Sequence, residues 1–248
     1  MIRPILDLLL SLRTAIWLFC GLIVLLFAGA VVMPAHQEFQ SIHAAPLIDW
    51  MEAQPFGITW WLWVSILLLV VLTANTLFCS VDSIIKKRKI TQWLLLISPQ
   101  VVHIGFLFIL LAHLLSSLGG FKGMAVAAEG TSLRVLDTAE LHVRSIDLSI
   151  DPNGYLTDWS VSLEYRDGGA PVRQDRLLPN KPSLYKGLNI HVKDLQAFPY
   201  RAVLLEVSRE PGAFWALIGG VLFMAGTIAL IAVKLRRAEK SAGEPAGP

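Results

Sequence analysis

Histidine is the residue type whose placement in this sequence most clearly suggests chemistry. Two of the six histidines, His103 and His113, lie in one long apolar segment at residues 93–118. An ionisable side chain inside a bilayer is rare and by default indicates function, and a neutral imidazole is a common ligand of haem iron. We therefore take His103 as the candidate axial ligand of a haem, and we expect the chain to hold a metal only through haem iron.

His103 and His113 cannot bind one haem from the same helix. Ten residues separate them, so His113 lies about 15 Å further along a helix and is rotated by about 80°. No other apolar segment contains a histidine, so the opposite axial ligand would come from another chain or be absent. His113 is thus a weaker candidate. The alternative for His103 is a buried histidine that hydrogen-bonds to a neighbour such as Asn75.

The other four histidines lie outside the apolar segments. His36 and His43 follow the first apolar segment, and they are weak candidates for a ligand set that a partner would complete. His142 and His191 fall in segments with the alternating pattern of strands. We expect structural roles for these two histidines.

The cysteines and the known sequence motifs exclude several functions. Cys20 and Cys79 form no C-x-x-C motif, which argues against a thiol–disulfide carrier, and no C-x-x-C-H motif attaches haem covalently. No P-loop, dinucleotide-binding, nucleophile-elbow or zinc-protease motif is present. The apolar segments contain no Asp or Glu, which argues against a proton pump, and a net charge of +2 gives no indication of nucleic-acid binding.

Four long apolar segments must position these residues. The chain of 248 residues is 54% hydrophobic and 16% charged, whereas soluble domains carry about 25% charged residues. A membrane helix needs about 20 mostly apolar residues, and four segments meet this condition, at about 14–33, 58–78, 99–118 and 213–233. For the third segment we favour a helix that starts at Ser98–Pro99 as cap and first residue. The alternative is a start near Trp93 with a kink at Pro99.

The distribution of Lys and Arg predicts the orientation of the helices. Basic residues occur near the N-terminus, between the second and third segments and in the C-terminal tail, whereas the connection at 34–57 has none. We therefore expect a multi-pass protein of the inner (cytoplasmic) membrane, with both termini in the cytoplasm. Ala28–Gly29–Ala30 offers a cleavage site, but the first apolar run is longer than a signal peptide requires. Aromatic belts are expected from Trp17, Trp60, Trp61, Trp63, Trp93 and Trp215.

A small antiparallel β domain is expected at residues 119–212, on the periplasmic or external side of the membrane and inserted between helices three and four. Apolar and polar residues alternate in several stretches between 124 and 210, and Asp151–Gly154 and Asp167–Gly169 are turn signals between them. A sandwich or partial barrel fits this pattern. Residues 1–118 would form the N-terminal membrane domain, 213–233 the fourth helix and 234–248 a cytoplasmic tail, irregular from Ala238.

Several local patterns, in this order, resemble the ResB-like (CcsB) family of cytochrome c biogenesis proteins of System II. They are the exit of the first helix at Gly29–Pro34, the second helix from Trp60 to Cys79, the H-x-G sequence His103–Gly105, the pair Glu129–Gly130, the P-x-x-Y-x-G sequence Pro182–Gly187, and Glu210–Gly212 before the fourth helix. The resemblance covers most of the chain. Two departures are a soluble domain shorter than the family's and Glu210 where Asp is commoner.

The resemblance implies a function together with a CcsA-like (ResC-like) membrane partner. The pair would move haem b across the membrane and promote its attachment to apocytochrome c. The family's membrane haem ligand would map onto His103, and His113 has no counterpart. Haem would be bound transiently and shared with the partner. The chain would then be part of a cytochrome c haem lyase complex whose catalytic centre lies mainly in that partner.

Two other functions remain open at this point. One is a haem-b electron-transfer subunit that oxidises quinol and anchors an external cytochrome. The other is a non-catalytic scaffold for the assembly of a cytochrome complex, which the short soluble domain favours.

Overall fold

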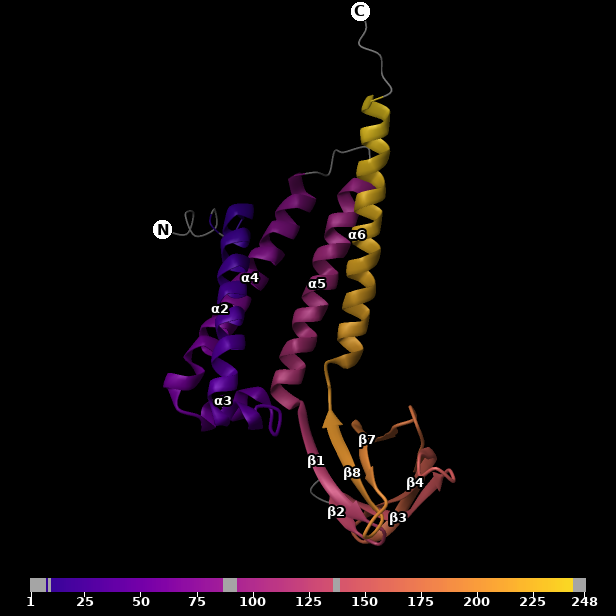
Figure 1. Ribbon diagram of the computed structural model, residues 1–248. Coiled ribbons are helices and arrows are strands. Elements are labelled where there is room, and N and C mark those ends of the chain that lie inside the picture. Colours follow the sequence, from indigo (N-terminus) through magenta and orange to yellow (C-terminus); the bar gives the residue numbers. More distant parts are fainter. Residues whose placement is uncertain (1–7, 9, 87–92, 136–138, 243–248) are drawn as a thin grey trace, which may run out of the picture. The chain divides into compact units, whose positions relative to one another are not determined.

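The structure is a computed structural model that describes residues 8, 10–86, 93–135 and 139–242 (Figure 1). The chain divides into two compact units. The first contains the long helices, and the second contains residues 119–211 together with His43–Leu47. The basic run that follows α4, the start of the chain with Arg3, and residues 243–248 lie outside the described residues.

Among the described residues, four helices are long and apolar enough to cross a membrane, as expected. These helices are α2 (Leu12–Val32), α4 (Phe56–Lys86), α5 (Trp93–Gly119) and α6 (Ala213–Ala242). The corresponding candidate spans are Leu12–Ala35, Phe56–Ile85, Ile97–Gly119 and Ala213–Arg236. A helix satisfies its own backbone hydrogen bonds, which is why such apolar runs are stable as helices in lipid.

Two expected helix boundaries were wrong. Pro99 lies inside α5, and the helix begins at Trp93 instead of at the Ser98–Pro99 cap. Proline removes one backbone hydrogen bond, but neighbouring residues of a membrane helix can compensate for it. Helix α6 continues to Ala242, so the tail expected to be irregular from Ala238 is helical as far as it is described.

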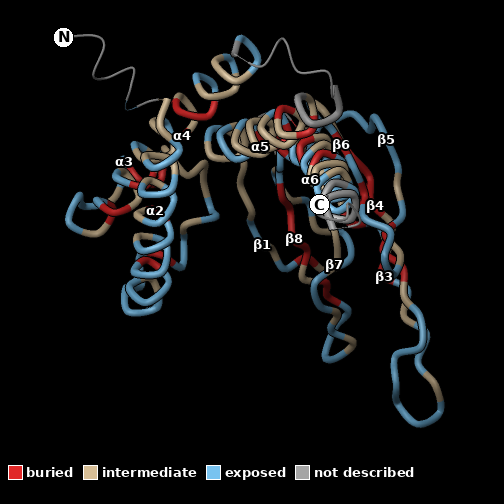
Figure 2. The backbone as a smooth tube through the Cα atoms, turned by 90° about the horizontal axis from the view of Figure 1, so that it is seen from above, coloured by how far each residue is buried: buried red, intermediate tan, exposed pale blue. Residues whose placement is uncertain are grey.

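The connection between α2 and α4 is folded into short helices. These are η1 (Met33–Ala35), η2 (Gln37–Ser41) and α3 (Leu47–Ala53). They bury Phe39, Trp50 and Met51 together with Trp61 of α4, and the indole Nε1 of Trp50 donates to Ser41 Oγ at 3.0 Å. Figure 2 shows these buried segments in red. Trp61 is only 5% exposed, so its expected place in an aromatic belt was wrong.

The seam between α5 and α6 is built from small residues. A Cβ at Gly219 would lie 2.7 Å from the carbonyl oxygen of Gly105, and a Cβ at Gly226 would lie 2.8 Å from the backbone nitrogen of Val102. A Cβ at Gly212 would collide with the carbonyl oxygen of Ala112. As the chain runs from Gly212 through Gly219 to Gly226, the contacted positions on α5 thus run in the opposite direction, from Ala112 to Gly105 to Val102. Small residues let membrane helices approach closely in this way.

Between α5 and α6, the described residues form eight strands in two antiparallel sheets of four strands. The first sheet has the order β1–β8–β7–β6 and the second β2–β3–β4–β5. The strands are β1 (Phe121–Ala128), β2 (Ser132–Arg134), β3 (Ala139–Ile150), β4 (Leu156–Asp167), β5 (Ala170–Leu177), β6 (Ser183–Tyr185), β7 (Leu188–Gln196) and β8 (Ala202–Arg209). The expectation of an antiparallel β region is confirmed.

Alternate residues of the two sheets form one apolar core, because side chains on a strand point to opposite faces in turn. Leu141, Val143, Val161 and Leu163 of one sheet are at most 1% exposed, as is Leu205 of the other. The core fixes which residues of each strand face outward. This second unit therefore has a defined outer surface on each sheet.

Candidate functional site

His103 lies where α5 contacts α4. Its Nδ1 atom is 2.7 Å from the hydroxyl oxygen of Ser80, near the end of α4. The imidazole is half-buried. A hydrogen bond at one ring nitrogen fixes the tautomer and leaves the other nitrogen for a ligand. With Nδ1 bonded to Ser80, Nε2 is the ring nitrogen that remains for another partner.

The neighbour that bonds to His103 Nδ1 is Ser80, whereas the sequence had suggested Asn75 as an example of such a neighbour. The Asn75 side chain is buried and its Nδ2 donates to the carbonyl oxygen of Ser11 at 3.4 Å. Because α4 remains helical to Lys86, it carries Ser80 to the depth of His103 and leaves Asn75 about one and a half turns away. In the sequence, Ser80 is marked only as a polar residue that follows an apolar run.

Other polar side chains are buried in the same stretch of the two helices. Thr76 of α4 is 9% exposed, and Ser98 and Gln100 of α5 are 3% and 7% exposed. Gln100 Oε1 has no hydrogen-bond partner among the described residues. Buried polar atoms usually have a partner or a bound water. Thr76, Ser98 and Gln100 thus add buried polar groups to the same stretch of α4 and α5 that carries Ser80 and His103.

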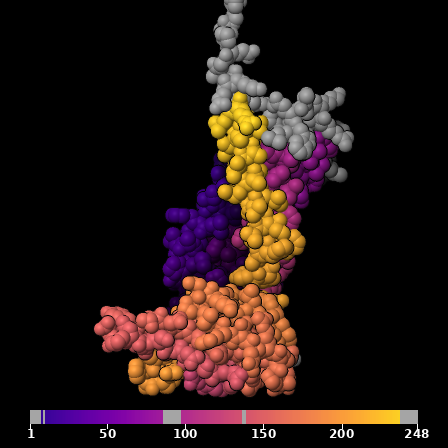
Figure 3. Space-filling view, turned by 90° about the vertical axis from the view of Figure 1, so that its right-hand side faces the viewer, coloured from indigo at the N-terminus to yellow at the C-terminus, as the bar shows by residue number. Residues whose placement is uncertain are grey.

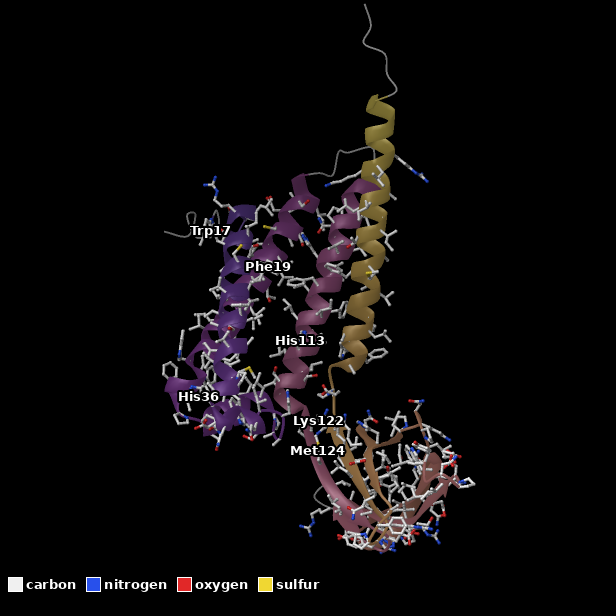
Figure 4. All side chains as sticks on the ribbon, in the orientation of Figure 1. Trp17, Phe19, His36, His113, Lys122 and Met124 are labelled. Atoms are coloured by element: carbon white, nitrogen blue, oxygen red, sulfur yellow. The ribbon has the colours of Figure 1, made fainter. Side chains whose placement is uncertain are left out.

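His113 lies on α5 and is exposed, and His36 follows α2 and is also exposed (Figure 4). The His36 ring contacts Phe39 edge-on, with a centroid distance of 6.4 Å. His43 belongs to the second unit, where its carbonyl oxygen accepts a hydrogen bond from the Lys122 N–H at 2.6 Å. Among the described residues, no group of three or more His, Cys, Asp or Glu side chains could hold a metal ion.

Two histidines and two cysteines have local surroundings that fit structural roles. His142 Nδ1 lies 3.0 Å from Ser132 Oγ, and His191 Nε2 lies 3.1 Å from Glu206 Oε1. Neither Cys20 nor Cys79 is in a disulfide. The residues of this chain therefore fit a haem only in part: His103 offers one imidazole, and a second axial ligand would come from another chain or be absent.

Glu206 is a buried carboxylate that the sequence analysis did not single out. It is 3% exposed, and Lys122 Nζ lies 2.8 Å from its Oε2 atom, with Lys193 Nζ at 3.4 Å. Burial by itself raises the pKa of this carboxyl, but the ion pairs with Lys122 and Lys193 and the charge of His191 outweigh burial and lower the pKa. The sequence signal is a lone acid between Leu205 and Val207 on a strand.

A second polar group closes one side of the β core. The Tyr165 hydroxyl is 2.6 Å from Ser183 Oγ, which donates to Asp175 at 2.6 Å. The Tyr165 ring stacks on Tyr185 with a centroid distance of 4.1 Å. Burial raises the pKa of Tyr165. These contacts stabilise the β unit and have no free nucleophile among them.

No family model matches the chain. The chain is 28% identical over 107 residues to a protein named cytochrome c biogenesis protein CcsB from Synechococcus sp. (strain JA-3-3Ab), covering 39% of this chain and 22% of that protein. Among solved structures it resembles the cytochrome c haem lyase CcmF with a TM-score of 0.43 and 13% identity, over 89% of this chain and 34% of CcmF. The chain thus spans about a fifth of the CcsB protein and a third of CcmF.

Proposed function

We propose that this chain is a membrane subunit of cytochrome c biogenesis that holds haem during its transfer to apocytochrome c. Partial sequence similarity to a CcsB protein supports the proposal. The observation that carries it is the placement of His103, a half-buried imidazole in a membrane-spanning helix with Ser80 at its Nδ1 atom. Such a group in lipid is expected to have a function.

In this proposal Ser80 Oγ accepts a hydrogen bond from the Nδ1–H of His103 and holds the ring, so that Nε2 would be the atom that binds iron. A CcsA-like partner supplies the opposite ligand, because His113 lies about 15 Å along the same helix. Haem b contributes a reduced iron and two vinyl groups that react with cysteine thiols of the apoprotein. In this proposal the residues of this chain bind and orient the haem, and the catalytic centre lies mainly in the partner.

The second unit would help to bring haem and apocytochrome c together. We place it on the external side of the inner membrane, with both termini in the cytoplasm, on the basis of the Lys and Arg distribution. Holding two reactants in one place lowers the barrier of a step that joins them. Cys20 and Cys79 take no part in this scheme.

The test is co-purification of the chain with its CcsA-like partner and comparison of haem spectra for the wild type and for His103→Ala. We expect the variant to lose haem from the complex and to abolish holo-cytochrome c in the same cells. His142→Ala, in the β unit, is the matched control and should leave both readouts unchanged. His113→Ala tests the weaker candidate on the same helix.

Other outcomes would contradict the proposal. If His103→Ala kept the full haem content and the normal yield of holo-cytochrome c, His103 would not be a haem ligand. If the haem were redox-active with quinol and cytochrome maturation were intact without the chain, the electron-transfer function would be favoured. If no haem copurified and only deletion of the whole chain impaired assembly, a scaffold role would be favoured.

A further inference from the structure

The two sheets of the β unit open at the connection from β5 to β6. Strand β5 pairs with β4 only over Val161–Asp167, and β6 pairs with β7 only over Leu188–Ile190. Beyond these points, residues 156–160 of β4 and 191–196 of β7 each pair on one side only within the described part of the chain. Each sheet therefore has a short free edge on the same side of the unit.

The turn between β6 and β7 determines which backbone groups of β7 are free. Lys186 and Gly187 have φ values of +47° and +79°, which is the pattern of a type I′ turn of two residues. The residues that flank such a turn exchange both hydrogen bonds, and alternate residues then face the same neighbour. The backbone N–H and C=O groups of Leu188 and Ile190 thus point toward β6. The backbone groups of Val192 point to the same side, but β6 has already ended there.

A hollow of about 300 Å³ lies beside this free edge. Trp159 of β4 lines it from one sheet, and His191 and Val192 line it from the other. Asn189 also lines it, and its Oδ1 atom is buried with no hydrogen-bond partner among the described residues. The hollow thus offers unpaired backbone groups, an unpaired side-chain oxygen and an aromatic ring.

The charges of the hollow are unbalanced. Lys181 and His191 line it, and no described lining residue is acidic. His191 already contacts Glu206 at 3.1 Å, whereas Lys181 is exposed and forms no ion pair with the described residues. Complementarity at this place favours a group with a negative charge.

We propose that the free edge of β7 accepts an extended polypeptide segment as an added strand, with its backbone beside Val192 and a carboxylate side chain near Lys181. Strand addition uses backbone hydrogen bonds for affinity and alternate side chains for specificity. An extended polypeptide with an acidic side chain matches three features of the hollow: the free backbone groups, the Trp159 ring and the cationic Lys181. The proposal concerns only the β unit and does not depend on His103.

A second copy of the chain is a poorer occupant of this edge. Lys193 is the extra residue of a β-bulge between Val192 and Asp194. Bulges and charged side chains are the devices by which proteins prevent their free edges from pairing with each other. The turns of the β3–β4 and β7–β8 hairpins lie at one end of the unit in Figure 3. They expose Tyr155, Leu156, Phe198 and Tyr200, which can contact apolar side chains of a bound segment.

The experiment uses the full chain in lipid nanodiscs and a short fluorescent peptide of alternating threonine and valine with one central glutamate. A matched peptide carries N-methyl groups on alternate backbone nitrogens, and another has lysine in place of glutamate. Fluorescence anisotropy measures binding to the wild type, to Lys181→Glu and to Arg134→Glu. Arg134 is an exposed arginine of β2 and serves as the charge-reversal control.

We expect the glutamate peptide to bind the wild type and N-methylation to weaken binding by about tenfold, since it removes backbone hydrogen bonds. Lys181→Glu should weaken binding of the glutamate peptide and restore binding of the lysine peptide, while Arg134→Glu should change neither. Equal binding of the N-methylated peptide would overturn strand addition. So would equal effects of the two charge reversals, or a dimer in sedimentation that Lys181→Glu dissociates while no peptide binds.

Discussion

The hydroxyl oxygen of Ser80 in α4 lies 2.7 Å from Nδ1 of His103 in α5. This contact joins two membrane-spanning helices through polar groups, in a region where an unpaired imidazole would be costly. It also distinguishes the two ring nitrogens of His103. The consequence for function is that Nε2, and not Nδ1, is the atom to test as a ligand.

Replacing Ser80 should disturb the ring of His103 without removing it. For Ser80→Ala we expect a mixed tautomer in the ¹⁵N NMR spectrum of labelled His103 and weaker haem retention by about tenfold, within the range seen when a ligand's supporting hydrogen bond is lost. Ser80→Thr should restore the wild-type spectrum. Ser117→Ala, on a half-exposed serine of α5, is the control; if it had the same effect as Ser80→Ala, the positioning role would be wrong.

The small-residue seam between α5 and α6 should be sensitive to single methyl groups. A Cβ at Gly105 would lie 2.5 Å from the backbone nitrogen of Phe223, so Gly105→Ala should destabilise the helix pair by about 1–3 kcal/mol. Gly219→Ala should behave in the same way. Gly220→Ala is the matched control, because nothing lies within 4 Å of its Cβ; it should be neutral or stabilise by up to about 1 kcal/mol. Thermal unfolding in detergent measures the difference.

The buried Glu206 should make the β unit sensitive to acid. Its folded-state pKa lies below the ordinary value of 4.5, since Lys122, His191 and Lys193 outweigh the opposing effect of burial. The stabilisation is therefore present above about pH 4.5 and is lost as the pH falls through the lower folded-state pKa. We therefore expect the unfolding temperature of the wild type to decrease as the pH is lowered below about 4.5.

Glu206→Gln is the variant that checks the source of the acid sensitivity. We expect it to lower the unfolding temperature at neutral pH, because it leaves Lys122 without its buried partner, and to flatten the dependence on pH. Glu140→Gln, on a half-exposed acid of β3, should keep the wild-type profile. An unchanged slope in Glu206→Gln would assign the acid sensitivity to other carboxylates.

The proposed orientation can be tested by thiol labelling in intact cells. With Cys20 and Cys79 replaced by serine, Asp158→Cys in the exposed part of β4 should react with a membrane-impermeant maleimide added outside. A cysteine in place of Lys234 should react only after the cells are opened. Labelling in the reverse order would place the β unit in the cytoplasm and contradict the proposed delivery of haem outward.

The sequence by itself determined the four membrane-spanning helices and the antiparallel β region. A helix of about 20 uncharged apolar residues is most stable in the lipid of a membrane. Apolar and polar residues alternate along a strand because its side chains point to two opposite faces in turn. It also singled out His103, because an imidazole in an apolar run is conspicuous without any knowledge of its neighbours. These features depend on the local composition of each segment, which can be read directly from the sequence.

The tertiary structure alone decided which residues meet. It gave His103 the partner Ser80 in place of Asn75, buried Trp61 against Gly29, and gathered Lys122, His191 and Lys193 around Glu206. Glycines at intervals of seven in α6 were visible in the sequence, but their counterparts on α5 became meaningful only when the two helices lay antiparallel. Contacts between distant segments depend on helix rotation and strand register, and a single sequence does not specify these one residue at a time.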